Sequence, residues 1–204
     1  MSTEKLPVNI KYKSDQDSTK MVPIKQEKQN FIDNLVTGFY NLFGIETLND
    51  QKLQLALKRG RKDFRRTRLI NPNLVKAKLD GINLTGVNLN KVNLSEASLS
   101  KAQLHKTKMV GANLDSANLK GANLSRANLK DAQLSWADLR NTNLSNTLFY
   151  NANLTGADLD KSSILAAKRG FTKFDHARLP DGIFSSSLLF FVVIEKAGLT
   201  FSPP

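Results

Sequence analysis

Few residues in this sequence have side chains of the kind that catalyse reactions or bind metals. The chain of 204 residues contains two histidines and no cysteine, which excludes thiolate nucleophiles, disulfides and cysteine metal sites. His105 and His176 have no second histidine at metal-ligand spacing, and no glycine-rich phosphate loop or nucleophile elbow occurs. The sequence therefore predicts a protein that is not an enzyme and needs no cofactor or metal.

A dense group of basic residues lies between positions 58 and 68. Asp63 is its single acidic residue, and seven of its eleven positions are basic: Lys58, Arg59, Arg61, Lys62, Arg65, Arg66 and Arg68. Ammonium and guanidinium groups at this density are typical of a site that binds phosphate or an acidic surface. The alternative is a solvated end of a helix, where the helix dipole favours cations.

The chain as a whole is also basic. Its 30 Lys+Arg against 18 Asp+Glu give a formal net charge of +12, and residues 1–68 carry half of this excess. A balance of this sign favours partners such as nucleic acid, anionic lipid or an acidic protein face. The alternative is a protein kept in solution by its self-repulsion.

A period of five residues dominates the sequence from Leu69 onward. Every fifth residue from Leu69 to Leu189 is large and apolar except Arg169. The residue two positions earlier is Ala, Val, Ile or Thr throughout 77–157, and the residue between the two is mostly Asn or Asp. A helix turns about 100° per residue and a flat strand alternates with period two, so neither gives a stripe at this period.

The period instead predicts a chain that bends once every five residues. Four bends close a coil of 20 residues, and the next coil stacks about 4.8 Å away through strand pairing. The large and small residues then point inward, while the Asn or Asp between them bonds to the backbone of the bend. His105 and His176 are expected to face solvent on different sides of the coil.

Two aromatic residues are predicted to lie outside the coil. Trp136 has no packing reason to be exposed, and Tyr150 is expected on the neighbouring side of the coil. Because exposed tryptophans are enriched at interaction hot spots, both residues are candidate contacts with a partner. The alternative is a surface tryptophan without a role.

Several units of the repeat share one sequence pattern. They read Ala112-Asn113-Leu114-Asp115-Ser116, Ala122-Asn123-Leu124-Ser125-Arg126 and Ala157-Asp158-Leu159-Asp160-Lys161. The pattern resembles the A(D/N)LXX motif of the pentapeptide-repeat family, strongly over residues 72–161 and more weakly over 162–191. The resemblance implies an all-β solenoid, a right-handed quadrilateral β-helix of about six coils, and a bacterial, often cyanobacterial, origin. It says almost nothing about function.

The segments around the repeat suggest four parts. Residues 1–28 are predicted to be a disordered polar tail, 29–66 a helical cap or arm, 67–191 the β-helix and 192–204 a C-terminal cap or tail. The apolar run Leu188–Ile194 is expected to belong to the last coil and its cap. The resemblance also allows it to form a homodimer. No apolar stretch suited to a secretion signal occurs near the start, so a cytoplasmic location is expected.

The helical part is predicted to contain two helices. Phe31, Leu35 and Phe39 recur at helical spacing before Gly44, and a second helix beginning at Asn49 or Asp50 is expected to extend along one side as far as Phe64. An open β-helix exposes a hydrophobic end, so these helices are expected to cap it. The alternative is that the segment 31–43 docks onto a partner protein or a membrane surface.

Irregular and charged positions of the repeat are further candidate contacts. The break at Arg169 predicts a loop over residues 168–171 that is a candidate contact point; the alternative is an irregularity of the coil without a role. On the coil surface, four cations are predicted to stack on one side, and His105, Lys106 and Arg126 lie on the next; the four are Lys101, Lys120, Arg140 and Lys161.

The hypothesis favoured by these features is a non-enzymatic scaffold or adaptor that presents a rigid β-helical surface to a protein partner. The resemblance also implies gyrase inhibition by DNA mimicry, as in quinolone-resistance proteins, but that requires a negative rod. Here residues 69–204 are net positive, which disfavours mimicry. Two further hypotheses are direct nucleic-acid binding through the basic segment and the basic sides of the coil, and attachment to a membrane surface through residues 31–43.

Overall fold

The computed structural model describes residues 24–180 of the chain. The sequence-based expectations for residues 1–23, and those for the apolar run 188–194 and the C-terminal cap, therefore lie outside the described residues. The chain divides into two compact units, Met1–Phe39 and Tyr40–Pro204.

Helix α1 (Ile24–Leu42) supplies the described part of the first unit and ends in the second. It begins at Ile24, which corrects the prediction that disorder extends to residue 28. Gly44 follows the helix at φ 64, a left-handed conformation that commonly ends helices. The helix predicted from Phe31, Leu35 and Phe39 is thus present, and it is longer than expected.

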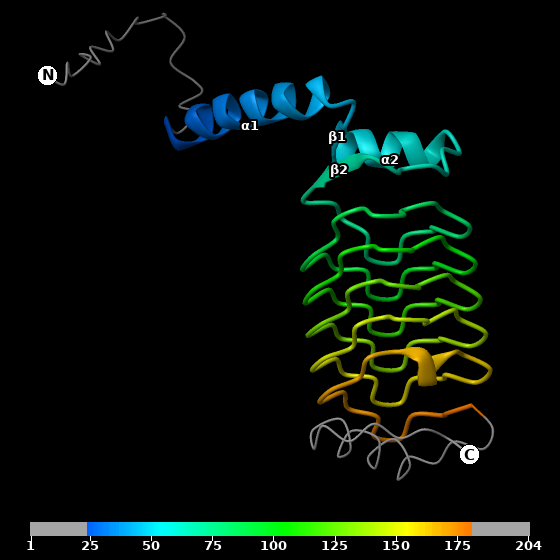
Figure 1. Ribbon diagram of the computed structural model, residues 1–204. Coiled ribbons are helices and arrows are strands. Elements are labelled where there is room, and N and C mark those ends of the chain that lie inside the picture. Colours follow the sequence, from blue (N-terminus) through cyan, green and yellow to red (C-terminus); the bar gives the residue numbers. More distant parts are fainter. Residues whose placement is uncertain (1–23, 181–204) are drawn as a thin grey trace, which may run out of the picture. The chain divides into compact units, whose positions relative to one another are not determined.

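The second unit begins with a short cap that covers the first coil. Strand β1 (Glu46–Asn49), helix α2 (Asp50–Lys58) and strand β2 (Thr67–Ile70) follow one another, and the two strands pair in parallel (Figure 1). The Asn49 side chain accepts a hydrogen bond of 3.0 Å from the Lys52 N–H and thereby caps α2. Leu53 of α2 is 2% exposed and packs in the hydrophobic core, as a cap requires.

The second helix ends earlier than the sequence suggested. It stops at Lys58, and Phe64 is not on a helix but fully buried inside the first coil. Phe64 occupies the inward position one unit before Leu69, and the first bridge between coils joins Asp63 to Asn83. The repeat therefore begins before the predicted boundary at residue 67.

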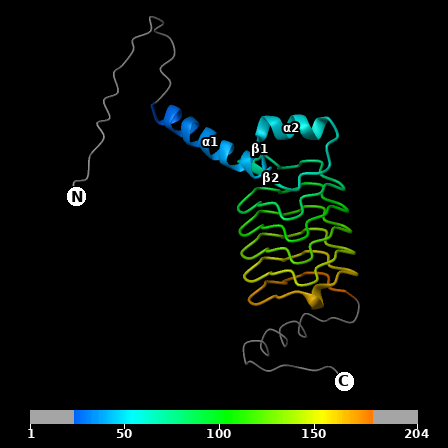
Figure 2. The ribbon, with the colours of Figure 1, turned by 45° about the horizontal axis from the view of Figure 1, so that its top comes forward.

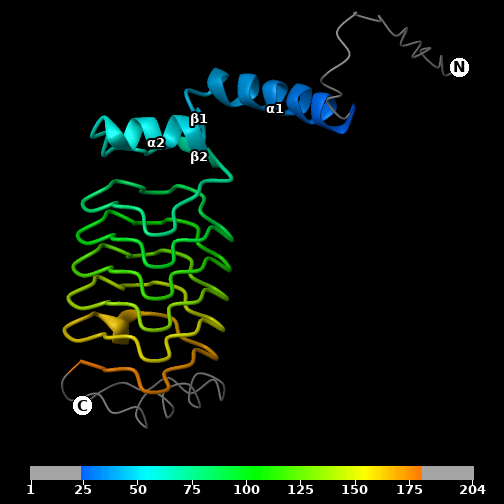
Figure 3. The ribbon, with the colours of Figure 1, turned by 180° about the vertical axis from the view of Figure 1, so that it is seen from behind.

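Residues 61–180 form six stacked coils of 20 residues (Figures 2 and 3). Parallel bridges join residues that are 20 apart, from Asp63↔Asn83 to Asp158↔Arg178. These bridges are isolated residues between bends, not long strands. The coil length predicted from the period of five is confirmed.

Each coil has four faces, numbered 1 to 4. In the third coil their large inward residues are Leu104 (face 1), Met109 (face 2), Leu114 (face 3) and Leu119 (face 4). Residues exactly one coil apart belong to the same face. The inward residues form one continuous core, in which Leu114 and Ala117 are 0% exposed. Threonines at small inward positions bond their hydroxyls to backbone carbonyls, as Thr107 does to Leu84 at 3.1 Å, so the burial of this hydroxyl leaves no unpaired polar group.

The outward Asn and Asp side chains bond to the bends, as predicted. In the usual unit the side-chain oxygen accepts from the N–H two residues later, as Asn113 does from Asp115 at 2.9 Å. Where Asn or Asp is missing, the acceptor can come from the previous coil. Asn90 accepts from the Val110 N–H at 2.9 Å, because Lys108 stands where the unit would otherwise have its own acceptor.

The same replacement occurs at two other units. Asp80 accepts from the Ser100 N–H at 3.1 Å, where Ser98 stands in place of Asn. Asp115 accepts from the Ser135 N–H at 2.9 Å, in a unit where Gln133 stands in place of Asn. At these three units the missing acceptor is thus replaced by a residue one coil earlier, which is adjacent in the stack.

The break at Arg169 is not a bulging loop. The register of the coils continues across it, since Leu148 bridges Lys168 and Asn153 bridges Lys173. The irregular part is the 3-10 helix Ile164–Ala166, and Arg169 is 5% exposed. Its guanidinium donates to the Ile164 carbonyl at 2.7 Å, so the arginine occupies an inward position with a backbone partner.

The replacement of acceptors between coils can be tested at Val110. We expect Asn90→Ala to lower the free energy of unfolding by about 1 kcal/mol, because the Val110 N–H loses its acceptor. In a Lys108→Asn background the cost should fall, since an asparagine in place of the lysine would accept from Val110 as other units do. Urea unfolding of the two single variants and the double variant measures this coupling. Equal costs in both backgrounds would contradict it.

Candidate binding surface

Trp136 lies on the corner between faces 3 and 4, in a conformation unusual for its size. Two residues follow each large inward residue and form a corner. The second of them has positive φ in most units, and Trp136, in this position, has φ 60. Gly, Asn or Lys fills most of these positions, and Asn tolerates this region better than other L-residues. The Trp136 side chain is nonetheless 66% exposed. A bulky, exposed and strained side chain is not explained by the stability of the coil.

The Trp136 ring rests on a glycine of the next coil. A Cβ built at Gly156, one coil later, would lie only 2.6 Å from Cδ2 of Trp136. The ring therefore needs the absence of a side chain at Gly156, and the glycine backbone supports one side of the indole. The exposed fraction shows that much of the ring still meets solvent. This arrangement holds the indole in place without burying it.

Tyr150 has the same kind of support on a different corner. A Cβ at Gly170 would overlap the tyrosine ring. Tyr150 is 39% exposed and belongs to the corner between faces 2 and 3. Trp136 and Tyr150 therefore lie on adjacent corners, and the structure does not bring them into one patch. A glycine one coil (20 residues) after an outward aromatic residue is the sequence signal that could have predicted both supported rings.

The basic segment 58–68 is not one face of a helix. Only Lys58 belongs to α2, and the rest lies in the connection and the first coil. Arg61 pairs with Glu46 at 2.6 Å and lies 4.6 Å from the Phe64 ring centroid. Arg65 pairs with Asp63 at 2.7 Å, and Arg68 lies over the Tyr40 ring.

The remaining members of the segment differ in their contacts. The Lys62 ammonium donates to the Asp80 carbonyl at 2.8 Å. Within residues 24–180, the side chains of Lys58, Arg59 and Arg66 have no hydrogen bond or ion pair. Much of this segment thus joins the cap to the first coil, a role that the sequence did not reveal.

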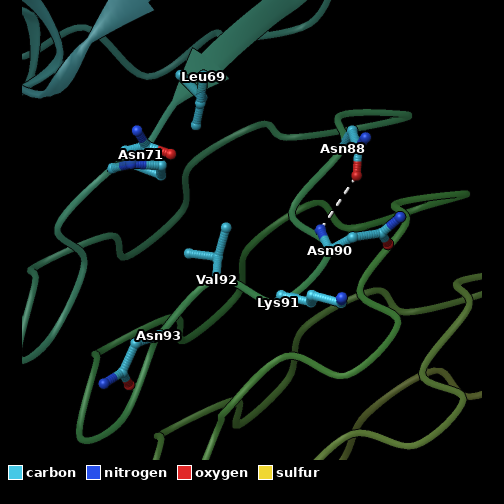
Figure 4. A pocket seen from close by; sticks show the side chains of 8 residues that line it. Leu69, Asn71, Asn88, Asn90, Lys91, Val92 and Asn93 are labelled. Atoms are coloured by element: carbon cyan, nitrogen blue, oxygen red, sulfur yellow. Dashed lines mark hydrogen bonds between the residues drawn. The ribbon is translucent and has the colours of Figure 1, made fainter. Parts of the chain in front are cut away.

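A shallow pocket opens between β2 and the second coil (Figure 4). Its volume is about 400 Å³, and its lining comprises Leu69, Asn71, Pro72, Asn88, Asn90, Lys91, Val92 and Asn93. The pocket exists because β2 pairs with β1, and Asp50 of α2 accepts from the Asn73 N–H at 3.0 Å. In the described part of the chain, no bridge joins Arg68 to Asn88 or Asn73 to Asn93. The wall of the solenoid is therefore open here.

Charges on the coil surface are distributed unevenly. The outward positions of face 2 and its two corners hold one carboxylate, Asp131, against a larger set of cations: Arg65, Arg66, Arg68, Lys91, Lys106, Lys108, Arg126, Lys130 and Lys168. On the opposite face 4, cations are accompanied by carboxylates. Arg140 pairs with Asp138 at 2.6 Å and Arg178 pairs with Asp158 at 3.4 Å. The four cations predicted to stack on that side do so, but carboxylates such as Asp80 and Asp160 lie among them, and Arg140 is paired.

Helix α1 presents apolar side chains to solvent. Phe31, Leu35 and Phe39 are all exposed. No helix among the described residues is long and apolar enough to cross a membrane. Docking of this helix onto a partner or a membrane surface stays a prediction.

The histidines lie apart, as predicted. The His105 Nδ1 is 2.8 Å from the Ser125 hydroxyl on the corner between faces 1 and 2. His176 is exposed on the corner between faces 3 and 4. Among residues 24–180 no group of three or more His, Asp or Glu side chains is placed to hold a metal ion.

Three surface carboxylates have lowered pKa values. The Arg65 side chain and backbone hydrogen bonds lower the pKa of Asp63 from 3.8 to about 2. Hydrogen bonds from Ser100 and Ser98 lower the pKa of Asp80, and Arg140 lowers that of Asp138. A carboxyl with a lower pKa in the folded than in the unfolded state stabilises the fold while ionised. This stability is complete above the ordinary value and is lost as the pH falls through the lower, folded value.

We therefore expect the thermal unfolding temperature to fall between pH 5 and pH 2, and to fall less in Asp80→Asn. The asparagine keeps an acceptor oxygen for the Ser100 N–H but cannot be protonated in this range. Thermal unfolding followed by circular dichroism at several pH values provides the measurement. Parallel pH profiles for the wild type and the variant would show that Asp80 does not contribute.

The seat of Trp136 can be tested with a glycine substitution. Gly156→Ala should displace the indole and add strain at φ 70, which together destabilise the fold by roughly 1–2 kcal/mol or more. Because the chain contains one tryptophan, its emission reports on Trp136 alone, and we expect the emission maximum to shift.

Gly121→Ala is the matched control. It has φ 69, but its Cβ would meet only Lys101 Cγ at 3.7 Å. It should therefore show the strain without a change in emission. An unchanged emission maximum in Gly156→Ala would mean that the indole does not rest on this glycine.

Comparison with known families agrees with the repeat. Eight copies of the family model for pentapeptide repeats match between residues 61 and 164, over the overlapping segments 61–86, 77–115, 97–132, 108–146 and 127–164. No curated protein matches the chain. The fold implied by this family model is a right-handed quadrilateral β-helix.

Solved structures of pentapeptide repeat proteins also match. Rfr23 from the cyanobacterium Cyanothece 51142 is 30% identical, with 51% of this chain and 61% of Rfr23 covered and a TM-score of 0.32. A protein of the Arabidopsis thaliana thylakoid lumen is 23% identical, with 58% and 76% covered and a TM-score of 0.29. HetL of Nostoc sp. strain PCC 7120, involved in regulating heterocyst differentiation, is 22% identical, with 67% and 99% covered and a TM-score of 0.25.

The chain thus spans about three fifths of the length of Rfr23. The eight matched copies cover half of its own residues and coincide with the stacked coils. The chain belongs to the pentapeptide-repeat family.

Proposed function

We propose that this protein is a non-enzymatic scaffold that binds a protein partner through the corner carrying Trp136. The observation that carries the proposal is the combination of exposure, positive φ and a glycine seat at this residue. Lys, Glu and Arg adopt the same backbone conformation at other corners, so the feature that distinguishes Trp136 is its large, exposed indole supported by Gly156. The equivalent position of other corners holds Asn141, Asn146 and Asn151.

The surroundings of Trp136 suit a protein partner better than a polyanion. Face 3 and this corner carry Glu96, Asp115 and Asp175. Lys76 pairs with Glu96 at 3.4 Å, and Lys173 also lies on face 3, so the three carboxylates and two cations leave little net charge. A supported indole surrounded by Ser, Thr and Asp side chains is similar to the anchors of protein interfaces, where a rigid aromatic lies inside a polar rim.

Two competing functions receive less support. DNA mimicry needs a negative rod, whereas face 2 is strongly basic and face 4 is close to neutral. Attachment to a membrane surface or a second partner through α1 is favoured by the exposed aromatic residues of this helix. Such attachment is compatible with the proposed scaffold. The cytoplasmic location predicted from the sequence stays a prediction, since one matched protein comes from the thylakoid lumen.

The test is a substitution that removes the indole without disturbing the coil. Trp136→Asn should leave the thermal unfolding temperature unchanged or raise it, because Asn suits this conformation. Affinity capture from a lysate of the source cells with the full chain, quantified by mass spectrometry, should show at least a tenfold loss of the specific partner.

The control variant is Lys101→Asn, which changes a residue of the same conformation, φ 56, on another corner. It should retain the partner. If the Trp136→Asn variant retains its partner as well as the wild type does, the proposal is wrong.

A further inference from the structure

Face 2 and its corners differ from the rest of the coil surface in two independent ways. The first is charge. Lys91, Lys106, Lys108, Arg126, Lys130 and Lys168 are exposed and, within residues 24–180, form no ion pair. Asp131, the single carboxylate among them, accepts from the Asn151 side chain at 3.0 Å. We call this surface, with Arg66 and Arg68, the basic face.

The arrangement of the cations follows from the coil. Lys106 and Arg126 are one coil apart and therefore stack on one corner, about 4.8 Å from each other at the backbone. Lys108 lies on the flat of face 2, and Lys130 on the far corner. From Arg66 to Lys168 the basic face extends over five coil steps, or about 24 Å. Every coil except the fifth contributes a cation, so the basic face is an extended strip and not a single cluster.

The second difference is the position of aromatic residues. Tyr150 lies on the same corner as Lys130, one coil further along, with its ring supported by Gly170. Phe171, 63% exposed, follows on the same corner. A strip of cations bordered by exposed aromatic rings combines the two features by which proteins hold single-stranded nucleic acid: backbone neutralisation and base stacking.

The pocket at the N-terminal end of the strip adds hydrogen-bonding groups. Asn88, Asn90 and Asn93 line it beside Lys91 (Figure 4). The oxygens of these asparagines accept backbone N–H groups, while their amide NH2 groups donate to no residue of 24–180. Amide groups of this kind match the edges of unpaired bases.

From these features we propose that the basic face binds single-stranded nucleic acid, with Lys and Arg on the phosphates and bases stacked on Tyr150 and Phe171. An acidic protein would also meet the cations, but the exposed rings along the strip favour a ligand whose own groups stack. This inference concerns a different face from Trp136. If the basic face does not bind nucleic acid, the proposed scaffold function still stands. If the scaffold function is wrong, the nucleic-acid proposal still stands.

The experiment measures binding of fluorescently labelled single-stranded dT20 and rU20 to the full chain by anisotropy, at several salt concentrations. We expect the logarithm of the affinity to fall linearly with the logarithm of the salt concentration. A variant with Lys106, Lys108, Arg126 and Lys130 changed to Gln should bind at least tenfold more weakly. Its salt slope should be smaller by about 0.7 per lost phosphate contact.

The matched control changes four cations of the opposite side, Lys78, Lys101, Lys120 and Lys161, to Gln. All four are exposed, and the net charge changes by the same amount. This variant should keep most of the affinity. Circular dichroism and the unfolding temperature establish that both variants fold. An equal loss in the two variants would mean that binding follows net charge alone, and it would overturn the proposal.

A third variant separates stacking from charge. Tyr150→Ala should weaken binding about tenfold with an unchanged salt slope, because the lost contact is uncharged. A 20-base-pair duplex and a poly-glutamate peptide are the competing probes. If the duplex binds as tightly as dT20, or if poly-glutamate binds more tightly with the same dependence on the four cations, the single-stranded assignment is wrong.

Discussion

The structure depends on one constraint, the closure of the chain into a four-sided coil around a narrow apolar interior. Each bend must place one large and one small side chain inside, and the next coil must repeat the pattern in register. Leu114, Leu134 and Leu154 on face 3 follow this rule within one stack and are fully buried. Because the interior is nearly the same in every coil, it dictates the fold and leaves the outward positions almost unconstrained by packing.

Relations on the surface follow from the same closure. A residue is stacked on the equivalent residue of the previous coil, so support comes from the neighbouring coil more than from the neighbouring sequence. Asn90 supplies the acceptor that the unit of Lys108 lacks, and Gly156 supplies the space that Trp136 needs. A substitution at Asn90 or Gly156 therefore has its first effect on a residue one full coil away.

The period of five predicted the coil well because it is a local signal repeated many times. Sequence reasoning failed at Phe64, which fits the apolar side of a helix and the inward series equally well. Only the packing of the cap decides between the two. It also failed at Arg169, since a buried guanidinium with a carbonyl partner cannot be told from a loop residue by its type. The charges show a similar limit: the coil length correctly stacked Lys101 and Arg140 on one side, but the pairing of Arg140 with Asp138 depends on side-chain geometry.

A core that is indifferent to its outward residues allows one rod to carry unrelated surfaces. The Trp136 corner is nearly neutral and has a supported aromatic ring, while the basic face has unpaired cations and is centred on face 2, which does not border that corner. The inward Leu and Ala residues fill the space between the two surfaces. The strain at Trp136 is tolerable for the same reason: a coil stabilised by its neighbours on both sides withstands a local cost of about 1–2 kcal/mol without losing its register. If both proposed surfaces bind ligands, binding at one should leave the other unchanged, because the core between them does not depend on the outward side chains.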